Sequence, residues 1–588
     1  MKIENLITEH IDIWTSAVKT KSTSGRGSSK KLELYGVKKL RELILELAVR
    51  GKLVPQDPND EPASLLLERI AAEKAQLVKD KKIKKPKKLP KIKKEEAPFK
   101  LPKGWSFSRL EDLCELITKG SSPKWQGVSY TENPEDVLFV TSENVGAFEL
   151  LLENRKYVEK KFNDIEPRSI LRKEDFLMNI VGASIGRTAL YDIDDLANIN
   201  QAVCLIRSFP QQVSTRFFLT FFNSLTCVSY MYDKQVENAR PNLSMGNISK
   251  FVIPVPPIHE QHRIVAKVDE LMALCDQLEQ QTEASIEAHQ VLVTTLLDTL
   301  TNSADADELM QNWARISEHF DTLFSTEESI DQLKQTILQL AVMGKLVPQD
   351  PSDEPAAELL KRIADEKAQL VKDKKIKKQK ALPPISEGEK PFELPNGWEW
   401  CRLPDLGELA RGKSKHRPRN DPKLYENGNI PLVQTGDVAR ANGTILTYTA
   451  KYNEFGLAQS QLWPKGTLCI TIAANIADTA TLGFDACFPD SVVGYTPYDK
   501  EIPTVYFDYF IKTAKENLER FAPSTAQKNI NLEILSNVLV PCPPMQQFPR
   551  IVEKVNLLLG ICDELKERLK ESQMSQLQLT DAIVEQAV

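Results

Sequence analysis

A long internal repeat constrains this chain more than any other feature of its sequence. Residues 44–90 and 337–383 are identical at 38 of 47 positions when they are aligned with an offset of 293. Two further pairs of segments align in the same order, 98–116 with 391–409, and 252–278 with 539–565 at an offset of 287. The residues between these blocks have diverged. The chain therefore consists of one frame used twice, and it holds a divergent insert in each copy.

A duplicated frame with divergent inserts suits a protein that presents two related surfaces to two different targets. A duplicated enzyme with one decayed site would leave a similar pattern.

At 588 residues the chain is too long for one hydrophobic core. It has no apolar run of the roughly 18 residues that a membrane span needs, and its first residues lack a secretory signal. We expect a cytoplasmic protein without a membrane segment. The nine cysteines lie at least 18 residues apart, which excludes C-x-x-C spacing and predicts reduced thiols.

The inserts and the blocks that follow them differ in their hydrophobic pattern. Short β-type runs lie at 137–145, 175–191, 201–208, 430–438 and 467–484, which predicts mixed α/β domains. After each Pro-Pro turn, apolar residues are spaced four and three apart, as in Ile264, Val268, Leu271, Cys275 and Leu278, and again in Ile551, Val555, Leu558, Cys562, Leu565 and Leu569. This spacing predicts long coiled-coil helices. The alternative is that each helix packs on its own domain.

These patterns predict the domain boundaries. We expect an N-terminal helical region (1–97), a first α/β domain (98–257), a long helix (258–300), a central helical region (301–390), a second α/β domain (391–545) and a last helix (546–588).

Positive charge is clustered although the chain has a net charge of −6. Residues 79–94 hold ten lysines against one acid, and 372–380 hold six against one. Each run is either a solvated spacer or a contact to a phosphate backbone or an acidic partner. The inserts themselves are not basic, because 100–255 contain 18 basic and 19 acidic residues and 393–541 contain 15 and 17. A domain of that charge would bind duplex DNA weakly without a partner that supplies positive charge.

One motif suggests a nucleotide site. Residues 407–414, GELARGKS, satisfy the G-x-x-x-x-G-K-[ST] pattern of a phosphate-binding P-loop. That loop requires a buried strand before it and a helix after it, but Pro418 and Pro422 follow within nine residues. The first copy has CELITKGSSPKWQ (114–126) at this place, without the first glycine and the lysine. We expect a basic turn in both copies, and a P-loop NTPase is the alternative.

The ordered set of repeated segments resembles the specificity subunit of type I DNA restriction-modification enzymes. The resemblance rests on LPKGW and LPNGW, PPIHEQHRIV and PPMQQFPRIV, RPNLSMGNI and TAQKNINLEIL, and the long repeat, and it covers nearly the whole chain. It implies two similar α/β target-recognition domains separated by two long antiparallel coiled-coil helices in a pseudo-two-fold arrangement, with additional helical repeat regions. It also implies that the chain reads a two-part target in double-stranded DNA and recruits two methyltransferase subunits and the restriction (motor) subunits. The second copy departs from the pattern, because Phe548 and Pro549 replace Gln261 and His262 and put the start of the last helix in doubt.

Arginine and lysine pair with guanine, and asparagine and glutamine pair with adenine, so exposed turns that carry these residues are candidate readers of DNA. In the first copy we select Lys119, Ser121, Ser122, Lys124, Ser142, Asn144, Arg187, Arg240 and Asn242. In the second copy we select Arg411, Lys413, Ser414, Lys415, His416, Arg417, Arg419, Gln434, Thr435, Gln527, Lys528 and Asn529.

Two further sequence patterns resemble metal or nuclease sites, but neither is complete. HEQH (259–262) lacks metal-ligand spacing, and Glu159 to Lys161 with Asp136 imitate a nuclease site that has no counterpart in the second copy. Trp105 and Trp398 are expected to be core anchors, with base stacking as the alternative. We find no methyl-donor motif and expect no catalytic residue, cofactor or metal. A purely structural interaction protein is the third hypothesis.

Overall fold

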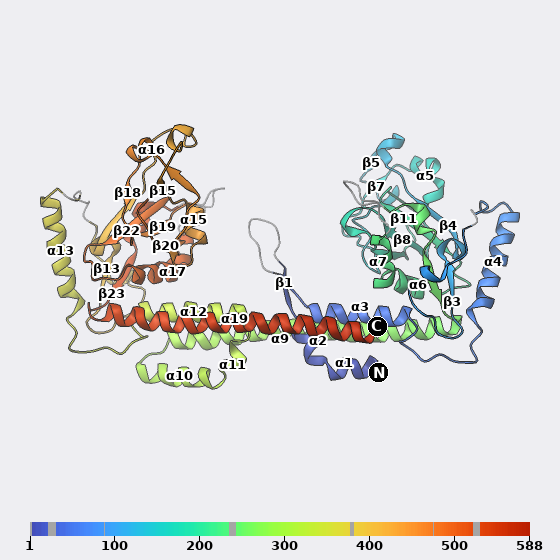
Figure 1. Ribbon diagram of the computed structural model, residues 1–588, viewed down its shortest axis with the longest axis horizontal. Coiled ribbons are helices and arrows are strands. Elements are labelled where there is room, and N and C mark those ends of the chain that lie inside the picture. The colour runs from blue at the N-terminus through green and yellow to red at the C-terminus, as the bar shows by residue number, and fades with distance from the viewer. Residues whose placement is uncertain are drawn as a thin grey trace. The chain divides into compact units, whose positions relative to one another are not determined.

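The computed structural model describes residues 3–21, 31–86, 89–233, 243–374, 376, 382–473, 475–520 and 530–588. These residues belong to two compact units, one containing 1–285 with 572–588 and the other containing 286–571 (Figure 1). The chain passes between the units after Ser285 and after Glu571. Both passages lie inside continuous helices, α9 (Ile258–Thr301) and α19 (Gln547–Ala587).

Three sheets build the β-rich part of the first unit. The largest has the antiparallel order β4 (Cys114–Lys119), β11 (Val203–Ser208), β8 (Asp175–Asn179), β9 (Thr188–Tyr191). A second sheet has the order β10 (Ala197–Ile199), β6 (Val137–Val140), β7 (Tyr157–Val158), β5 (Tyr130–Thr131), with β10 and β6 parallel. A two-stranded ribbon pairs β3 (Ser106–Arg109) with β12 (Val252–Val255) and so joins the beginning of the insert to its end.

The second unit repeats the strand order of the main sheet and of the ribbon although the two inserts have diverged in sequence, but the fourth strand of its other sheet lies at the opposite edge. Its main sheet runs β14 (Gly407–Arg411), β22 (Val492–Pro497), β19 (Leu468–Thr471), β20 (Thr479–Leu482), with β16 (Thr444–Ile445) added at the edge. The other sheet runs β17 (Ala450–Tyr452), β15 (Ile430–Leu432), β21 (Ala486–Cys487), β18 (Leu462–Trp463), and β15 and β21 are parallel. The ribbon pairs β13 (Glu399–Arg402) with β23 (Leu539–Cys542).

The helices complete both units. Those outside the long helices are α1 (Ile3–Glu9), α2 (Ile11–Ser16), α3 (Tyr35–Val49), α4 (Ala63–Lys79), α5 (Lys161–Ile165), α6 (Thr215–Phe222), α7 (Leu225–Asp233), α8 (Met245–Ile248), α10 (Ala306–Glu318), α11 (Phe320–Leu323), α12 (Glu327–Val342), α13 (Ala356–Lys372), α14 (Leu403–Leu406), α15 (Thr435–Arg440), α16 (Glu454–Ala458), α17 (Thr504–Arg520) and α18 (Leu532–Asn537). A short strand pair, β1 (Lys19–Lys21) with β2 (Lys31–Glu33), precedes α3.

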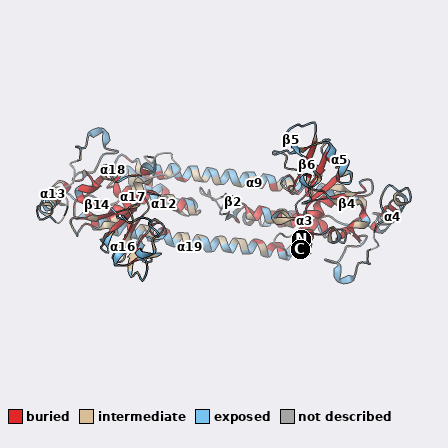
Figure 2. Ribbon diagram, turned by 90° about the horizontal axis from the view of Figure 1, so that it is seen from above, coloured by how far each residue is buried: buried red, intermediate tan, exposed pale blue. Residues whose placement is uncertain are grey.

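The inner strands of the two main sheets are largely buried, and Figure 2 shows red strands in both units. All five residues of β8 and all four of β6 are buried, so these strands lack the alternation of a half-exposed strand. The runs predicted as strands at 137–145, 175–191, 201–208 and 467–484 each contain strands of these sheets. The run at 430–438 forms a strand only as far as Leu432, because α15 begins at Thr435.

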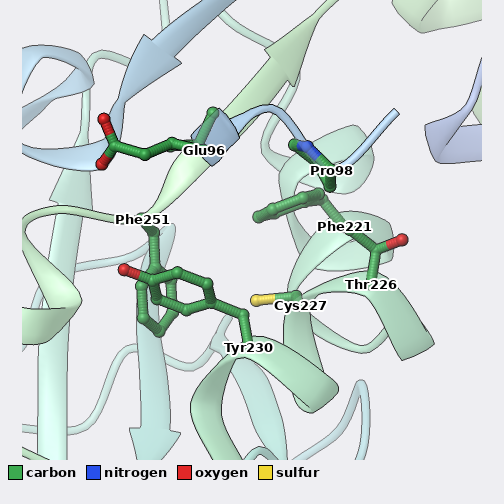
Figure 3. Close-up of a pocket in the computed structure, with 8 residues that line it drawn as sticks. Glu96, Pro98, Phe221, Thr226, Cys227, Tyr230 and Phe251 are labelled. Atoms are coloured by element: carbon green, nitrogen blue, oxygen red, sulfur yellow. The ribbon is translucent and has the colours of Figure 1, made fainter. Parts of the chain in front are cut away.

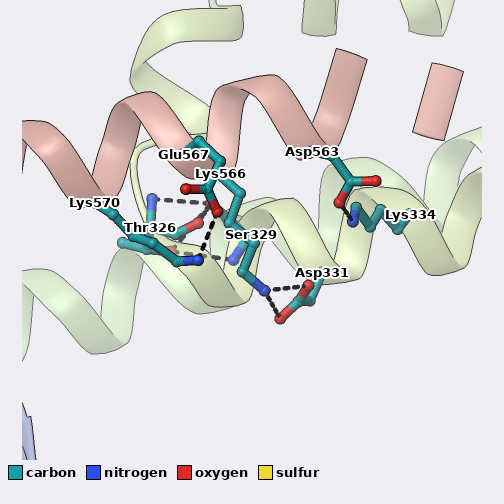
Figure 4. Close-up of polar contacts among 8 residues, drawn as sticks. All are labelled: Thr326, Ser329, Asp331, Lys334, Asp563, Lys566, Glu567 and Lys570. Carbon is teal, nitrogen blue, oxygen red and sulfur yellow. Dashed lines mark hydrogen bonds and ion pairs between the residues drawn. The ribbon is translucent and has the colours of Figure 1, made fainter. Parts of the chain in front are cut away.

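The repeated frame forms the helical part of each unit. In the second unit, heptad residues Ile551, Val555 and Cys562 of α19 are buried in one core with Leu333 and Ile337 of α12. Lys334 of α12 also pairs with Asp563 of α19, and Lys566 pairs with Asp331 (Figure 4). In the first unit, Arg41 of α3 binds Asp276 and Glu279 of α9 at 2.7 Å. The frame helix therefore lies along the long helix in each unit.

The start of α19 is settled despite its unusual sequence. The helix begins at Gln547, and Phe548 is fully buried against Tyr506 at a ring-centroid distance of 4.9 Å. Pro549 lies in the first turn, where its missing N–H has no partner to lose. The lysine runs begin at the last residues of α4 and α13, and parts of both runs, 87–88, 375 and 377–380, lie outside the described residues.

Candidate nucleic-acid interface

Two glycines mark the points where the candidate loops leave the main sheets. Gly120 follows β4 and donates to Val203 O, and Gly412 follows β14 and donates to Val492 O. A Cβ at Gly120 would collide with the carbonyl oxygen of Ile199, and one at Gly412 would collide with that of Pro489. Only glycine fits at these positions. The two loops therefore leave from equivalent places in two sheets of the same strand order.

In the first unit the loop is short and basic. Lys119 and Lys124 are exposed, and Ser121 and Ser122 are partly exposed. A 3₁₀ turn, η3 (Pro123–Gln126), carries Lys124. Gln126 fixes this turn by donating to Ser121 Oγ at 3.1 Å and to Glu166 Oε1 at 2.9 Å. The structure thus brings the four predicted residues of this loop together, with two lysine side chains in solvent.

In the second unit the loop is longer and carries more charge. Lys413, Lys415, Arg417 and Arg419 are exposed, as is Arg411 at the end of β14. Ser414 is buried instead, and its carbonyl oxygen accepts from Arg417. The peptide bond between Arg417 and Pro418 in this loop is cis.

Residues that sequence reasoning did not select hold this loop in place. The side-chain oxygen of Gln459 accepts from the backbone N–H groups of Lys415 at 2.6 Å and His416 at 3.0 Å. Gln461 accepts from Lys413 Nζ at 2.5 Å. Asp490 pairs with Arg419 through both carboxylate oxygens at 2.8 Å. These three residues are more than 40 positions away from their partners, so no local pattern could have identified them.

The side chain of His416 makes two contacts with other residues of its domain. Its Nε2 lies 2.8 Å from Asp421 Oδ2, and its ring meets Phe455 edge-on at 5.4 Å. The hydrogen bond from His416 holds the pKa of Asp421 below its ordinary value. The imidazole is therefore occupied by an internal contact in this structure.

The predicted turn at 142–144 differs from the expectation for one residue. Ser142 is partly exposed, but Asn144 is buried. The Asn144 carbonyl accepts from Thr141 N and Oγ1, and its amide donates to Leu151 O and Asn154 O. The selection of Asn144 as an exposed DNA contact is therefore corrected, because every polar atom of its side chain is used inside the turn.

The remaining candidates fall into two groups. Arg187 is exposed in the turn between β8 and β9, Gln434 is exposed before α15, and Thr435 is the first residue of that helix. Arg240, Asn242, Gln527, Lys528 and Asn529 lie outside the described residues.

The GELARGKS segment does not have the structure of a P-loop. Its first five residues, Gly407–Arg411, form strand β14, which pairs with β22. Residues 412–421 contain no helix, and the next element is the short 3₁₀ turn η7 (Pro422–Leu424). Phosphate binding by a P-loop depends on the N–H groups of a helix that directly follows the loop, so the nucleotide hypothesis fails here.

Other suspected chemistry is also explained by structural contacts. Glu159 pairs with Lys161 at 2.7 Å and accepts from Ser129 N, while Asp136 accepts from Thr131. Trp105 and Trp398 are buried, as predicted for core anchors. Among the described residues, no group of three His, Cys, Asp or Glu side chains is arranged to hold a metal ion.

A cavity in the first unit lies beside the ribbon β3/β12, among Glu96, Pro98, Phe221, Cys227 and Tyr230 (Figure 3). Two of its polar wall residues are engaged, because Glu96 pairs with Arg109 and Thr226 donates to Glu46. None of the helices in the described part of the chain is long and apolar enough to cross a membrane.

Comparison with known proteins places these two units in a family. Residues 102–288 and 395–572 match the Type I restriction modification DNA specificity domain, once in each copy of the repeat. The chain is a member of the type I specificity-subunit family. It is 41% identical to the EcoAI specificity subunit of Escherichia coli and 38% identical to the EcoEI specificity subunit of the same organism, in both cases over 100% of each chain. The HsdS subunit from Thermoanaerobacter tengcongensis aligns at 18% identity with a TM-score of 0.41, over 84% of this chain and 98% of that one.

The specificity subunit attaches each recognition domain to its frame by the same contacts. Lys74 of α4 donates to Glu111 O and to Cys114 O, and Lys367 of α13, its repeat equivalent, donates to Pro404 O, the equivalent of Glu111 O, at 2.7 Å. Arg263 of α9 pairs with Asp60, and Arg550 of α19 pairs with Asp353.

A third equivalent pair closes each attachment. Arg109 pairs with Glu96, as Arg402 does with Glu389. All these residues lie in or beside the repeated blocks. The repeat therefore encodes the same set of attachment contacts for two recognition domains of different sequence.

Proposed function

We propose that each recognition domain of this specificity subunit reads one half of a two-part target in double-stranded DNA, the first with residues 98–257 and the second with residues 391–545. The observation that supports this proposal is the pair of loops after Gly120 and Gly412. They leave equivalent points of sheets with the same strand order, but they differ in length, charge and sequence. A common support with different loops is what two half-sites of different sequence require.

In the first domain, the proposed contacts are Lys119, Ser121, Ser122, Lys124 and Arg187. The two lysines and Arg187 are exposed and can bind phosphates or guanine edges, while the serine hydroxyls can contact either strand. Ser142 remains a secondary candidate, and Asn144 supports its turn.

In the second domain, the proposed contacts are Lys413, Lys415, Arg417, Gln434 and Thr435. Gln434 is exposed and is suited to adenine, whereas the lysines and Arg417 are suited to guanine or phosphate. Arg411 and Arg419 both bond to Asp490, so they reach DNA only as part of that fixed cluster.

The subunit acts within a larger complex. Neither recognition domain is basic overall, with 18 basic and 19 acidic residues in 100–255 and 15 and 17 in 393–541. Since affinity for duplex DNA grows with the number of neutralised phosphates, partners must contribute charge. We infer that two methyltransferase subunits, one for each copy of the frame, and the restriction subunits supply that charge and all catalysis, while this chain supplies recognition and scaffolding without a cofactor.

The test is to co-express the chain with its methyltransferase subunit in a methylation-free host and to map modified adenines across the genome. A gapped two-part motif that disappears without this chain is expected. A stable complex that methylates without sequence preference would leave only a structural role.

Loop variants assign the two half-sites. Lys413→Ala with Lys415→Ala should relax only one half of the motif, and Lys119→Ala with Lys124→Ala only the other. If either double variant relaxed both halves equally, the one-domain, one-half-site proposal would be wrong.

A further inference from the structure

Several aromatic side chains of the first recognition domain are exposed, and the most exposed of those described is a tryptophan. Trp125, in the turn η3, is 75% exposed. Trp14, Trp105, Trp398 and Trp463 are all buried, which is the ordinary state of a tryptophan in a folded domain. An indole left in water forgoes the stabilisation of burial, so a partner that covered it would gain that stabilisation.

The second domain shows that this turn does not need an exposed aromatic residue. There the corresponding 3₁₀ turn has the sequence Pro422-Lys423-Leu424, and Leu424 is fully buried. In the first domain, Pro123-Lys124-Trp125 places the apolar residue outside instead. The domain therefore folds with Trp125 making little contribution to its core.

The turn holds Trp125 in a fixed position. Its backbone N–H donates to Ser122 O at 3.1 Å, and Val128 N donates to Pro123 O at 3.0 Å. Gly127 closes the turn at a φ of 67°, which favours glycine. The next residue, Gln126, is tied by its side chain to Ser121 and Glu166. A rigid backbone reduces the entropy that a contact made by the indole would cost.

The surroundings of Trp125 favour DNA over a protein partner. The same loop exposes Lys119 and Lys124, and the equivalent loop of the second domain exposes Lys413, Lys415 and Arg417. An aromatic ring flanked by lysines combines a surface for stacking on bases with cations for the neighbouring phosphates.

We propose that Trp125 is a specificity-determining contact of the first domain, and that its indole wedges against a base step of the first half-site while Lys119 and Lys124 bind the flanking phosphates. This inference rests on the proposed function. Apolar wedges of this kind partly unstack a base step, and the cost depends on the sequence of that step. Trp125 would thus select deformable steps at its half-site without hydrogen bonds to base edges.

The experiment measures binding of the gapped target duplex by the subunit in complex with its methyltransferase subunits, over a range of salt concentrations. Trp125→Ala should weaken binding about 10- to 100-fold, the effect of removing one aromatic stacking contact, with an unchanged dependence on salt. Trp125→Phe should restore part of the affinity. Lys124→Gln should instead reduce the slope of log affinity against log salt by about one.

Trp313→Ala is the matched control, because Trp313 is also exposed but lies on α10, outside both recognition domains. It should bind like the wild type. The inference is overturned if Trp125→Ala binds like Trp313→Ala, or if it prevents assembly with the methyltransferase, which would assign the indole to a protein partner. A wild-type complex that shows no half-site preference would instead overturn the proposed function.

Discussion

Lys566 donates hydrogen bonds of 2.7 Å to both carboxylate oxygens of Asp331 and so ties the long helix of the second unit to its frame helix. By the repeat offsets of 287 and 293, the equivalent residues of the first unit are Glu279 and Lys38, which carry the opposite charges. There Glu279 is bound by Arg41 at 2.7 Å. The two units therefore keep one helix packing but reverse the charges at one place in it.

Reversing one charge should destabilise the second unit. Lys566→Glu would place two carboxylates together, and we expect a loss of about 0.5 to 1 kcal/mol, the range for partly exposed pairs. The double variant Asp331→Lys with Lys566→Glu should recover most of the loss. Urea unfolding followed by fluorescence measures both, and a double variant as unstable as the single one would show that the pair itself contributes nothing.

The buried carboxyl of Glu260 is expected to make the stability of the first unit depend on pH. It is 1% exposed, accepts a hydrogen bond from Gln56, and burial raises the pKa of its carboxyl. For a carboxyl whose pKa is raised on folding, the stabilisation is present below the unfolded pKa of 4.5 and is lost as pH rises through the folded value. The contribution of Glu260 to stability should therefore fall as pH rises from 4.5 towards neutrality.

The equivalent residue of the second unit suggests a stabilising substitution and its control. That unit has Gln547 at this position, where the amide donates to Gln349 at 2.9 Å. Glu260→Gln should raise the melting temperature at pH 7 by about 2 to 4 °C, as expected for on the order of 1 kcal/mol in a unit of this size, and the gain should shrink near pH 4. Gln547→Glu should have the opposite effect at pH 7. Equal shifts at both pH values would exclude titration of Glu260 as the cause.

Gln459 should matter for DNA recognition although it lies outside the basic loop. Gln459→Ala removes the acceptor of two loop N–H groups, and at about 0.5 to 1.5 kcal/mol for each hydrogen bond it should weaken binding at one half-site several-fold. Competition with duplexes altered in one half at a time measures this. Leu446→Ala, an exposed apolar residue of the same domain, is the control for general damage.

The two helical passages between the units should set the gap in the DNA target. Four residues inserted after Ser285 and four after Glu571 lengthen each helix by about 6 Å, at 1.5 Å per residue. We expect the preferred gap to lengthen by one to two base pairs at about 3.4 Å each. Methylation mapping reads the gap directly, and an unchanged gap would refute the idea that these helices act as a ruler.

The repeat made the frame predictable, because nearly identical residues fold into equivalent helices and contacts. The pairs Lys74 with Glu111 O and Lys367 with Pro404 O follow from that identity, as does the burial of Trp105 and Trp398. Family membership was predictable for the same reason. The equal strand order of the two main sheets was not, since strand pairing joins residues far apart in the sequence and leaves no periodic signal.

The candidate site was only partly predictable. The basic loops were found from their composition, but Asn144 was misassigned because the pattern of polar residues does not distinguish a turn that uses its amide internally from one that exposes it. Trp125 and Gln459 were missed for opposite reasons. An apolar residue is expected to be buried, and Gln459 acts through a contact 44 residues away in the sequence.

Because both passages between the units are helical, an insertion in them changes a rotation about the helix axis as well as a length. Each residue added to a helix turns everything beyond it by about 100°, so four added residues leave a turn of about 40°, whereas seven bring the two sides back to within about 20°. Seven-residue insertions should therefore be better tolerated than shorter ones. Working variants of this subunit should occur at stepped lengths instead of a continuous range.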